Sequence, residues 1–402
     1  MVSAAPAHPA RAVALVCLAE ALSMTGFGAY PAFLPQLQAY WALSGAEAGF
    51  VSGAFFLGYM VAVPFLSGAT DRIDARAVFA FSCLLAAVGT AGFALFAQGT
   101  VSGAIWQSLA GAGLAGTYMP GLKALTDRIS GPRLPRYVAF YTSTFGIGTS
   151  ASLLAAGWLD AVLSWRAAFG LLAVGPLLAA PLLLAVLAPR RPHGADAARW
   201  LPRIGPVLAQ HDIRRAVFGY AAHCWELFGL RSWMVAFVAF AYGSSGAVSP
   251  LLWATAAAAL INLLGIPASV LGNEAASRVG RARWIGAVMV ASGTFAWLAG
   301  LSANWPWPLM LGVLAMHFVA VMADSAALTA GLVEVTPPEQ RGAALAVYSL
   351  MGFGAGFVAP LAVGAVLDAA GGANSRLAWT LAFGALGVGG LVWAATNGQS
   401  RR

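Results

Sequence analysis

The feature that most constrains this chain is the spacing of its charged residues. Six charge-free stretches run 23 to 26 residues, namely 21–46, 48–70, 137–159, 167–189, 342–367 and 377–400. Three more run 40 to 46 residues, namely 77–122, 232–273 and 284–323. A membrane-crossing helix needs about 20 apolar residues. Each short stretch therefore fits one membrane helix, and each long stretch fits two.

The long stretches contain polar or Pro/Gly interruptions at 98–100, 243–246 and 304–308. Splitting them there predicts twelve helices, starting near residues 12, 46, 76, 101, 135, 165, 213, 248, 283, 306, 340 and 376. An all-α membrane protein is required because lipid offers no hydrogen-bond partner to an open sheet edge. The runs also lack the alternation of a β-barrel.

The composition agrees with this interpretation. Hydrophobic residues make up 60% of the chain and charged residues 9%, against about 25% charged in soluble proteins. This excludes a soluble enzyme, a nucleic-acid binder and a disordered chain. Cys17, Cys83 and Cys224 all lie in apolar stretches, which predicts no disulfide framework. No HExxH, GxSxG or P-loop motif occurs, so we expect no cofactor, no metal site and no catalytic residues.

The distribution of Lys and Arg predicts the topology. Alternate loops and both tails carry nearly all of the arginines, whereas the opposite loops carry only Arg166 and Arg376. Cytoplasmic loops are the ones enriched in Lys and Arg. Both termini are therefore predicted to be cytoplasmic, in a bacterial inner membrane. The first apolar run contains Glu20 and has no convincing cleavage site, so it is interpreted as a span rather than a signal peptide.

The chain is predicted to consist of two halves. Residues 190–212 form the longest polar segment, which predicts six-helix halves at 1–189 and 213–402 joined by a linker. Ser277-Arg278 follows helix 8 about 206 residues after Asp71-Arg72 follows helix 2, and Arg341 aligns with Arg136. Matches in register along the chain indicate an internal duplication, which is typical of transporters.

The loop after helix 2, Ser67-Gly-Ala-Thr-Asp-Arg-Ile-Asp-Ala-Arg76, resembles the signature of the major facilitator superfamily, Gly-x-x-x-Asp-Arg-x-Gly-Arg-Arg/Lys. Asp71, Arg72 and Arg76 match, whereas Ser67 and Asp74 replace glycines. The resemblance extends over nearly the whole chain. It implies a cytoplasmic gate that latches the two halves, formed by Asp71, Arg72, Arg76, Arg278 and Arg281.

Two glycine patterns bear on drug efflux and on dinucleotide binding. Helix 5 lacks the Gly-Pro that resembles the mark of drug/proton antiporters, which weakens a drug-efflux interpretation. Gly111-x-Gly113-x-x-Gly116 matches a dinucleotide fingerprint, but it lies inside an apolar helix with no strand before it. We interpret these glycines as positions of close helix packing.

A few ionisable residues fall in mid-span, where each costs roughly 3 kcal/mol on insertion scales. These are Glu20 in helix 1, Glu226 and Arg231 in helix 7, and Asp324 in helix 10, accompanied by His223, His317 and the amide Asn262. Lys123, near the end of helix 4, is interpreted as an interface anchor that pairs with Asp127. In the family that the chain resembles, helices 1, 4, 7 and 10 line the central cavity.

Proton coupling is predicted for Glu20, Glu226, Asp324 and His317, because these groups can gain and lose a proton. His223 and Glu226 share one helix face, and His317 and Asp324 share another, which predicts two His–carboxylate proton relays. The alternative for Asp324 and Glu20 is a structural hydrogen bond through Ser325 or Thr25.

Arg231 either binds an anionic group of the substrate or forms a permanent salt bridge to Glu20, Glu226 or Asp324. Glu226 and Arg231 lie on different sides of a regular helix. Gly229 lies between them, and a break in the helix there would change the directions in which the two side chains point. The candidate substrate-binding residues are Arg231, Glu226, His223, Tyr30, Tyr118 and Asn262.

The sequence therefore predicts a secondary transporter that moves a small organic anion or zwitterion by alternating access and is driven by protons. The expected partners are the small-molecule substrate, protons and the lipid bilayer, with no nucleic acid, and the protein is expected to be a monomer. Two alternatives stay open, namely proton-driven efflux of drugs or toxic compounds, and a non-transporting membrane receptor or enzyme.

Overall fold

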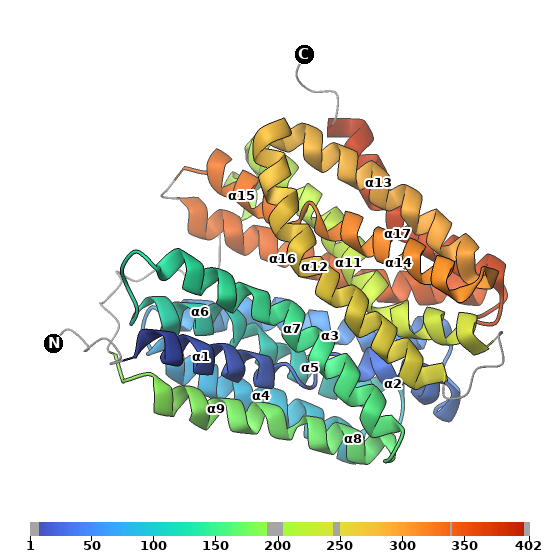
Figure 1. Ribbon diagram of the computed structural model, residues 1–402, viewed down its shortest axis with the longest axis horizontal. Coiled ribbons are helices and arrows are strands. Elements are labelled where there is room, and N and C mark those ends of the chain that lie inside the picture. Colours follow the sequence, from blue (N-terminus) through green and yellow to red (C-terminus); the bar gives the residue numbers. More distant parts are fainter. Residues whose placement is uncertain (1–7, 191–203, 244–249, 338–339, 398–402) are drawn as a thin grey trace. The chain divides into compact units, whose positions relative to one another are not determined.

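The computed structural model describes residues 8–190, 204–243, 250–337 and 340–397 (Figure 1). All regular elements in these ranges are helices. The first nine are α1 (Pro9–Ser23), α2 (Ala29–Tyr40), α3 (Gly45–Ala69), α4 (Ala75–Phe96), α5 (Thr100–Ala115), α6 (Tyr118–Thr126), α7 (Leu134–Asp160), α8 (Trp165–Leu172) and α9 (Val174–Val186). The others are α10 (Ile204–Ala209), α11 (His211–Gly243), α12 (Pro250–Val279), α13 (Arg281–Leu301), η1 (Ser302–Asn304), α14 (Trp307–Met322), α15 (Ser325–Val335), α16 (Arg341–Ala369) and α17 (Arg376–Asn397).

The helices follow the charge-free stretches. Within the described ranges, nine helical stretches are long and apolar enough to cross a membrane. A helix begins within about three residues of each predicted start, from Pro9 near 12 to Arg376. The prediction of an all-helical membrane protein is confirmed.

Four of the predicted helices consist of two pieces each. The breaks separate α1 from α2, α5 from α6, α8 from α9, and α14 from α15. Helices 1, 4, 6 and 10 are therefore interrupted partway along, and the breaks in helices 1, 4 and 10 lie close to Glu20, Tyr118 and Asp324. In contrast, α11 continues unbroken through Gly229, so Glu226 and Arg231 stay on different sides of a regular helix.

Side chains satisfy the backbone at the break between α1 and α2. The Gly28 N–H donates to Ser152 Oγ at 2.9 Å, and the Ser152 hydroxyl donates to the Thr25 carbonyl at 2.5 Å. The Thr25 hydroxyl donates to the carbonyl of Leu172 at 2.6 Å. These bonds are needed because lipid cannot replace the hydrogen bonds that a broken helix loses.

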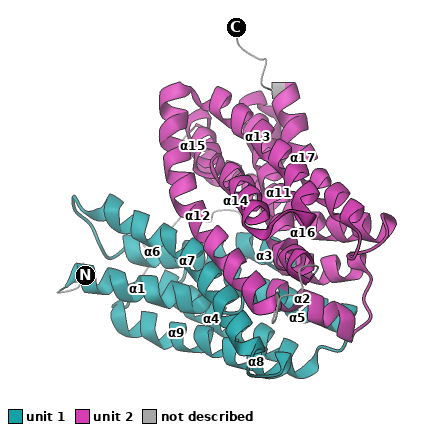
Figure 2. Ribbon diagram, turned by 45° about the vertical axis from the view of Figure 1, so that its right-hand side comes forward, with its two compact units in different colours: residues 1–30, 57–201 teal, residues 31–56, 202–402 magenta. Residues whose placement is uncertain are grey.

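The chain divides into two compact units (Figure 2), of which unit 1 comprises residues 1–30 and 57–201 and unit 2 comprises residues 31–56 and 202–402. The division near 201 falls inside the predicted linker 190–212, and most of that linker lies outside the described residues. The predicted halves at 1–189 and 213–402 stay a prediction.

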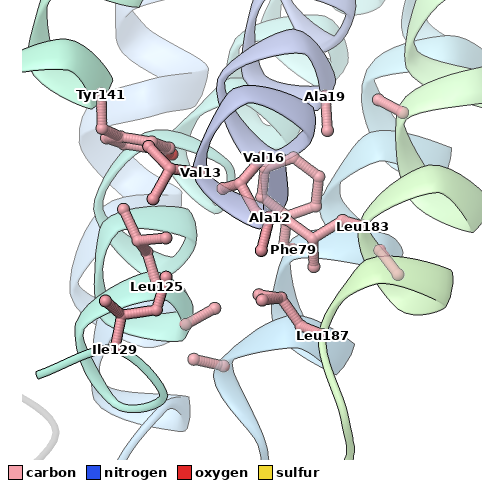
Figure 3. Close-up of a cluster of buried hydrophobic side chains, with 14 of the residues drawn as sticks. Ala12, Val13, Val16, Ala19, Phe79, Leu125, Ile129, Tyr141, Leu183 and Leu187 are labelled. Carbon is pink, nitrogen blue, oxygen red and sulfur yellow. The ribbon is translucent and has the colours of Figure 1, made fainter. Parts of the chain in front are cut away.

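Each unit has its own apolar core. In unit 1, α1, α4, α6, α7 and α9 surround fully buried side chains that include Val16, Phe79 and Leu183 (Figure 3). Tyr141 lies in the same cluster and carries the polar hydroxyl into it. The unit 2 core gathers side chains such as Val217 and Leu328 from α11 to α17.

Two of the three glycines of the fingerprint-like pattern, Gly113 and Gly116, lie where helices pack together, as the sequence predicts. A Cβ on Gly113 would overlap the backbone of Ala86 in α4, and a Cβ on Gly116 would overlap the Ser82 hydroxyl. No side chain fits at these points, which lets α4 and α5 approach at backbone distance.

Candidate functional site

Five of the predicted mid-membrane titratable side chains are almost completely buried. Glu20, His223, Glu226, His317 and Asp324 each expose at most 3% of their surface. Four of them lie in unit 2, on α11 and around the end of α14, and Glu20 lies in unit 1. The structure therefore contains one cluster of four titratable groups and a separate carboxyl group.

The first pair in the cluster joins α11 to α14. Nε2 of His317 lies 2.8 Å from Oε1 of Glu226. The Ser292 hydroxyl on α13 donates to the other carboxyl oxygen, Oε2, at 2.9 Å. Both oxygens of Glu226 thus have a partner, as a buried carboxyl group requires.

The second pair joins α11 to the break between α14 and α15. Nδ1 of His223 lies 2.7 Å from Oδ1 of Asp324. Asp324 is the second of the two residues between the helix pieces and directly precedes Ser325. Tyr220 stacks beside the His223 ring, with 5.8 Å between ring centroids.

The pairing differs from the prediction that each histidine works with the carboxylate on its own helix. Each histidine instead pairs with the carboxylate of the other helix. Side chains that share a helix face point in the same direction, so they face the neighbouring helix rather than each other. The four residues are brought together, but as two crossed pairs. No group of three or more metal-ligating side chains is placed to hold a metal ion in the described ranges.

Arg231 lies on α11 beyond the cluster. Its Nε donates to Oδ1 of Asn262 on α12 at 2.9 Å. Its guanidinium carbon lies 5.6 Å from the centroid of the Phe318 ring. A neutral amide and an aromatic face therefore hold the plane of the guanidinium. Four of the predicted substrate-binding residues, Arg231, Glu226, His223 and Asn262, lie in unit 2.

Tyr30 and Tyr118, the other two predicted substrate-binding residues, lie in unit 1. Tyr30 is 1% exposed and packs edge-on against Phe93. Tyr118 is half-buried and stacks on Tyr141, with 5.9 Å between the ring centroids. Tyr30 is therefore a core residue of its unit in this structure, whereas Tyr118 lies at the break between α5 and α6.

Glu20 contacts Tyr141 of α7 across the core of unit 1. Its Oε2 lies 3.1 Å from the Tyr141 hydroxyl oxygen. The alternative in which Thr25 satisfies Glu20 is wrong, because the Thr25 hydroxyl donates to the carbonyls of Leu22 and Leu172.

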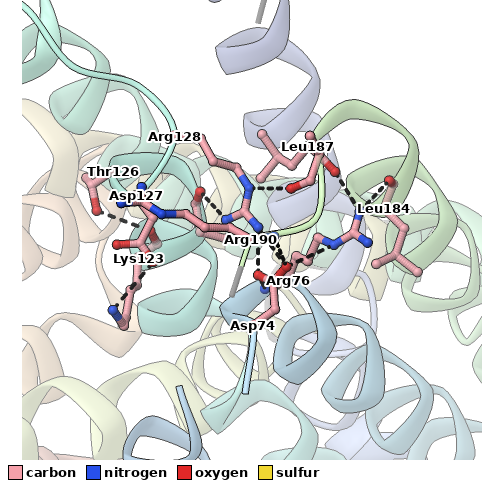
Figure 4. A network of polar contacts seen from close by, with 11 residues as sticks. Asp74, Arg76, Lys123, Thr126, Asp127, Arg128, Leu184, Leu187 and Arg190 are labelled. Carbon is pink, nitrogen blue, oxygen red and sulfur yellow. Dashed lines mark hydrogen bonds and ion pairs between the residues drawn. The ribbon is translucent and has the colours of Figure 1, made fainter. Parts of the chain in front are cut away.

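The loop motif between α3 and α4 of unit 1 is organised around Asp74 rather than Asp71 (Figure 4). Nη2 of Arg128 donates to both carboxyl oxygens of Asp74, at 2.7 and 2.8 Å. Nε of Arg76 lies 3.1 Å from Asp74, and the backbone N–H of Arg190 donates to it at 2.8 Å. Asp74 therefore ties the start of α4 to the end of α6 and to the segment after α9.

Asp74 also caps α4, because its side chain accepts the N–H of Arg76. Burial alone raises the pKa of Asp74, but the hydrogen bonds from Arg190, Arg128 and Arg76 outweigh it and hold that pKa below its usual value of 3.8.

We expect this carboxylate to make stability depend on pH. A group with a lowered folded pKa stabilises the protein above its unfolded pKa, and that contribution is lost as the pH falls through the folded value. The free energy of unfolding should therefore decrease below about pH 4. Unfolding by SDS in mixed micelles over a pH series measures it, and Asp74→Asn should remove most of this dependence. An equal pH dependence in Asp74→Asn would contradict the assignment.

The other predicted gate residues are distributed as follows. Asp71 and Arg72 are exposed, whereas Arg76 reaches the carbonyls of Leu184 and Leu187 in its own unit. In unit 2, Arg278 pairs with Glu274 on the exposed side of α12. The latch between halves stays a prediction. Lys123 lies 3.4 Å from Asp127, as predicted.

Arg281 makes the main ion pair at the corresponding loop of unit 2. Its Nε donates to Glu334 at 3.0 Å, and its Nη1 donates to Asn273 at 3.0 Å. Glu334 stands 206 positions after Arg128, and Arg281 stands 207 after Asp74. The two units thus contain the same ion pair with the charges exchanged.

Sequence reasoning missed Asp74 as the central residue of its loop, and also Arg128, Ser292 and Tyr141. The repeat contains a signal for Asp74 and Arg128, because Arg281 and Glu334 stand 207 and 206 positions after them. Glu226 lies 206 positions after Glu20, so the two carboxyl groups occupy equivalent places in the duplicated sequence. Ser292 has no such signal, because its hydrogen bond to Glu226 depends on where the fold places α13 relative to α11.

Comparison with known proteins agrees with this architecture. The model of the Major Facilitator Superfamily matches residues 16–273. A structure of a bacterial homologue of the human lysosomal transporter Spinster, inward-facing and occupied, has a TM-score of 0.75 at 15% identity and covers 96% of this chain and 95% of its own. A POT family transporter gives 0.71 at 15% identity, covering 98% and 100%. A nucleoside transporter gives 0.70 at 13%, covering 96% and 98%. These likenesses show the fold.

A curated relative is the niacin transporter of Acinetobacter baylyi, which is 26% identical over 129 residues. The match spans 32% of this chain and 29% of the relative's length. The family match, over residues 16–273, covers more than half of the chain. The chain belongs to the Major Facilitator Superfamily, and it is a multi-pass membrane transporter of small solutes rather than an enzyme.

Proposed function

We propose that the chain is a proton-coupled secondary transporter for a small organic anion or zwitterion, working by alternating access. The observation that carries the proposal is the pair of crossed His–carboxylate contacts buried in unit 2. Buried ionisable groups in membrane proteins are costly and mark ion or substrate pathways. Here four such groups form two pairs, each within hydrogen-bond distance, and the resulting site is suited to binding protons.

The chemistry of each pair supports one transferable proton. A pair with one shared proton has no net charge, because either the carboxylic acid is neutral or the ions cancel. Removing the proton leaves a buried negative charge, which is unfavourable without a compensating group. The proton-loaded pair is therefore the form that tolerates full burial, and the empty pair requires water or a counter-charge.

Arg231 supplies the anion preference in this proposal. A guanidinium presents five N–H donors in a rigid fork that matches a carboxylate. Asn262 and Phe318 fix its orientation. The curated relative transports niacin, a small aromatic carboxylic acid, which is consistent with an anionic substrate. Glu226, His223 and Tyr118 are the other proposed substrate contacts, whereas Tyr30 is left out because its side chain is buried in the core of unit 1.

The remaining parts of the proposal concern topology. The termini are proposed to lie in the cytoplasm of a bacterial cell, with the chain in the inner membrane as a monomer. The arginine-rich loops, with Asp71, Arg72, Arg76, Arg278 and Arg281, would then form the cytoplasmic gate. The Lys and Arg asymmetry of the sequence supports this orientation.

Transport into proteoliposomes tests the coupling. Radiolabelled nicotinate is the probe. In wild-type proteoliposomes, its accumulation should change when a pH gradient of either direction, acidic or alkaline inside, is imposed. Glu226→Gln removes a titratable member of the cluster and should lower gradient-driven accumulation at least about tenfold, which is 1.4 kcal/mol of driving force. Glu47→Gln, at an exposed glutamate in the first turn of α3, is the matched control and should behave as wild type.

Ligand-induced thermal stabilisation tests the substrate class. Nicotinate, a zwitterionic dipeptide, a neutral nucleoside and a lipophilic cation are compared, since a ligand that binds only the folded state raises its stability. Arg231→Ala should weaken binding of the anion roughly 10- to 100-fold, because a charged hydrogen bond contributes about 1.5–3 kcal/mol. Unchanged affinity would reject the anion role, and stabilisation by lipophilic cations alone would favour drug efflux instead.

A further inference from the structure

A second buried titratable site lies in unit 1, whereas the four-residue cluster belongs to unit 2. Glu20 is completely buried, and its Oε1 has no hydrogen-bond partner among the described residues. Its Oε2 contacts the Tyr141 hydroxyl at 3.1 Å. The Ser23 hydroxyl donates its proton to the backbone carbonyl of Glu20 at 2.8 Å. Tyr141 is therefore the group that determines how the carboxyl is satisfied.

The Tyr141 hydroxyl faces more acceptors than it has protons. It lies 2.9 Å from the carbonyl oxygen of Tyr118 and 3.3 Å from that of Thr117, in addition to Oε2 of Glu20. A phenol has one proton to donate and two lone pairs that accept. Carbonyl oxygens only accept, and the shortest of the three contacts is to Tyr118. The proton of Tyr141 is thus assigned to that carbonyl.

The break between α5 and α6 creates this arrangement. Gly116 and Thr117 lie between the two pieces, and Tyr118 begins α6. Gly121, one turn later, leaves room for the phenol, because a Cβ there would overlap the Tyr141 hydroxyl. The hydroxyl is therefore held close to the carbonyls at the break, and the Glu20 carboxyl meets its lone pair.

Among the described residues, no positively charged side chain forms an ion pair with Glu20 that would balance its ionised form. The groups that interact electrostatically with it are the thiols of Cys17 and Cys83 and the phenols of Tyr118 and Tyr141. They come from α1, α4, α6 and α7, and α9, which also packs on α1, has no titratable residue. A carboxylate buried among neutral groups is strongly unfavourable.

We propose that Glu20 is protonated in this structure and that its carboxyl O–H donates a hydrogen bond to the hydroxyl oxygen of Tyr141. Glu20 is then a second proton-binding site, and Tyr141 is its positioning residue. This inference rests on the proposed function in one respect, namely that the protein moves protons. Because Glu20 and Glu226 occupy equivalent positions in the duplicated sequence, each half of the transporter would then contain one buried acid site on its first helix.

Infrared difference spectroscopy of the purified protein in nanodiscs tests the inference without substrate. The carbonyl stretch of a protonated, buried carboxylic acid should be present at neutral pH and should disappear as the pH rises. Glu20→Gln should remove that band. Absence of a Glu20-dependent band at neutral pH, or a band that persists over the whole accessible pH range, would overturn the proposal.

Tyr141→Phe gives the sharper result because the two possible hydrogen-bond directions predict opposite shifts. If Tyr141 accepts from the acid, losing it should move the half-titration pH of the band down by about half to one unit. If Tyr141 donates to a carboxylate, the same variant would move it up, which would overturn the assignment. Tyr137→Phe, a buried tyrosine one turn earlier on α7, is the matched control and should leave the band unchanged.

Two further variants keep the result interpretable. Glu20→Asp withdraws the carboxyl group from Tyr141 by one methylene and should also lower the half-titration pH, even if Tyr141→Phe fails to fold. Glu226→Gln should leave the Glu20 band unchanged. Loss of coupling in proteoliposomes with an intact Glu20 band, or the reverse, separates a failure of the proposed function from a failure of this inference.

Discussion

Replacing Asp74 with alanine should lower the free energy of unfolding by about 3 kcal/mol, the lower end of the range for breaking a buried ion pair. The Arg128 side chain is 2% exposed, and Asp74 is its carboxylate partner. Without Asp74, the guanidinium stays buried beside the carbonyls of Ala188 and Ala124 without a compensating charge. The variant also removes the cap of α4, which adds to the loss.

Unfolding by SDS in mixed micelles measures this effect. Asp71→Ala is the matched control, because Asp71 is the same residue type in the same loop with an exposed side chain. That substitution should change stability by at most about 0.5 kcal/mol. The double variant Asp74→Ala/Arg128→Leu should recover part of the loss, since it no longer buries an unpaired charge. Equal effects of Asp74→Ala and Asp71→Ala would show that the network does not stabilise unit 1.

Gly113→Ala should prevent the native packing of α5 against α4. A Cβ at Gly113 would overlap the backbone of Ala86, and backbone atoms cannot rotate away as a side chain can. The helices must separate, which opens the interface along the line that also contains Gly89 and Gly116. Overpacking in a close-packed interior typically costs about 1–3 kcal/mol, and a backbone overlap lies at or above the upper end.

Gly170→Ala provides the control for this substitution. Gly170 lies in α8 of the same unit, and a Cβ there would meet nothing within 4 Å. Alanine should be neutral or slightly stabilising at that position because it favours helix more than glycine does. The yield of monodisperse protein and the SDS unfolding midpoint give the comparison. Similar stability of the two variants would contradict the packing role of Gly113.

The sequence alone determined the class of fold. Charge-free stretches of helix length leave few alternatives in a membrane, because every backbone group must be satisfied within its own segment. The predicted helix starts agree with the structure to about three residues. The interpretation of Gly113 and Gly116 as packing positions is confirmed for the same reason, since an apolar helix offers glycine little other use.

The sequence also identified which side chains are buried at the site, but not how they pair. Glu20, His223, Glu226, His317 and Asp324 are identified by the cost of placing ionisable groups in lipid. Their partners depend on the direction of each side chain and the rotation of each helix about its axis. Helical periodicity groups His223 with Glu226, whereas packing of α14 on α11 pairs Glu226 with His317.

Only the tertiary structure decided the places of Asp74 and Tyr141. In the sequence, Asp74 is a departure from a motif and Tyr141 is one tyrosine among nine. Arg128 meets Asp74 and Tyr141 meets Glu20 through contacts 54 and 121 residues apart in the chain. Burial can be predicted from local composition, because an apolar segment lies in the membrane and its ionisable side chains must then avoid lipid. Pairing is a property of two segments at once, and a linear pattern does not contain it.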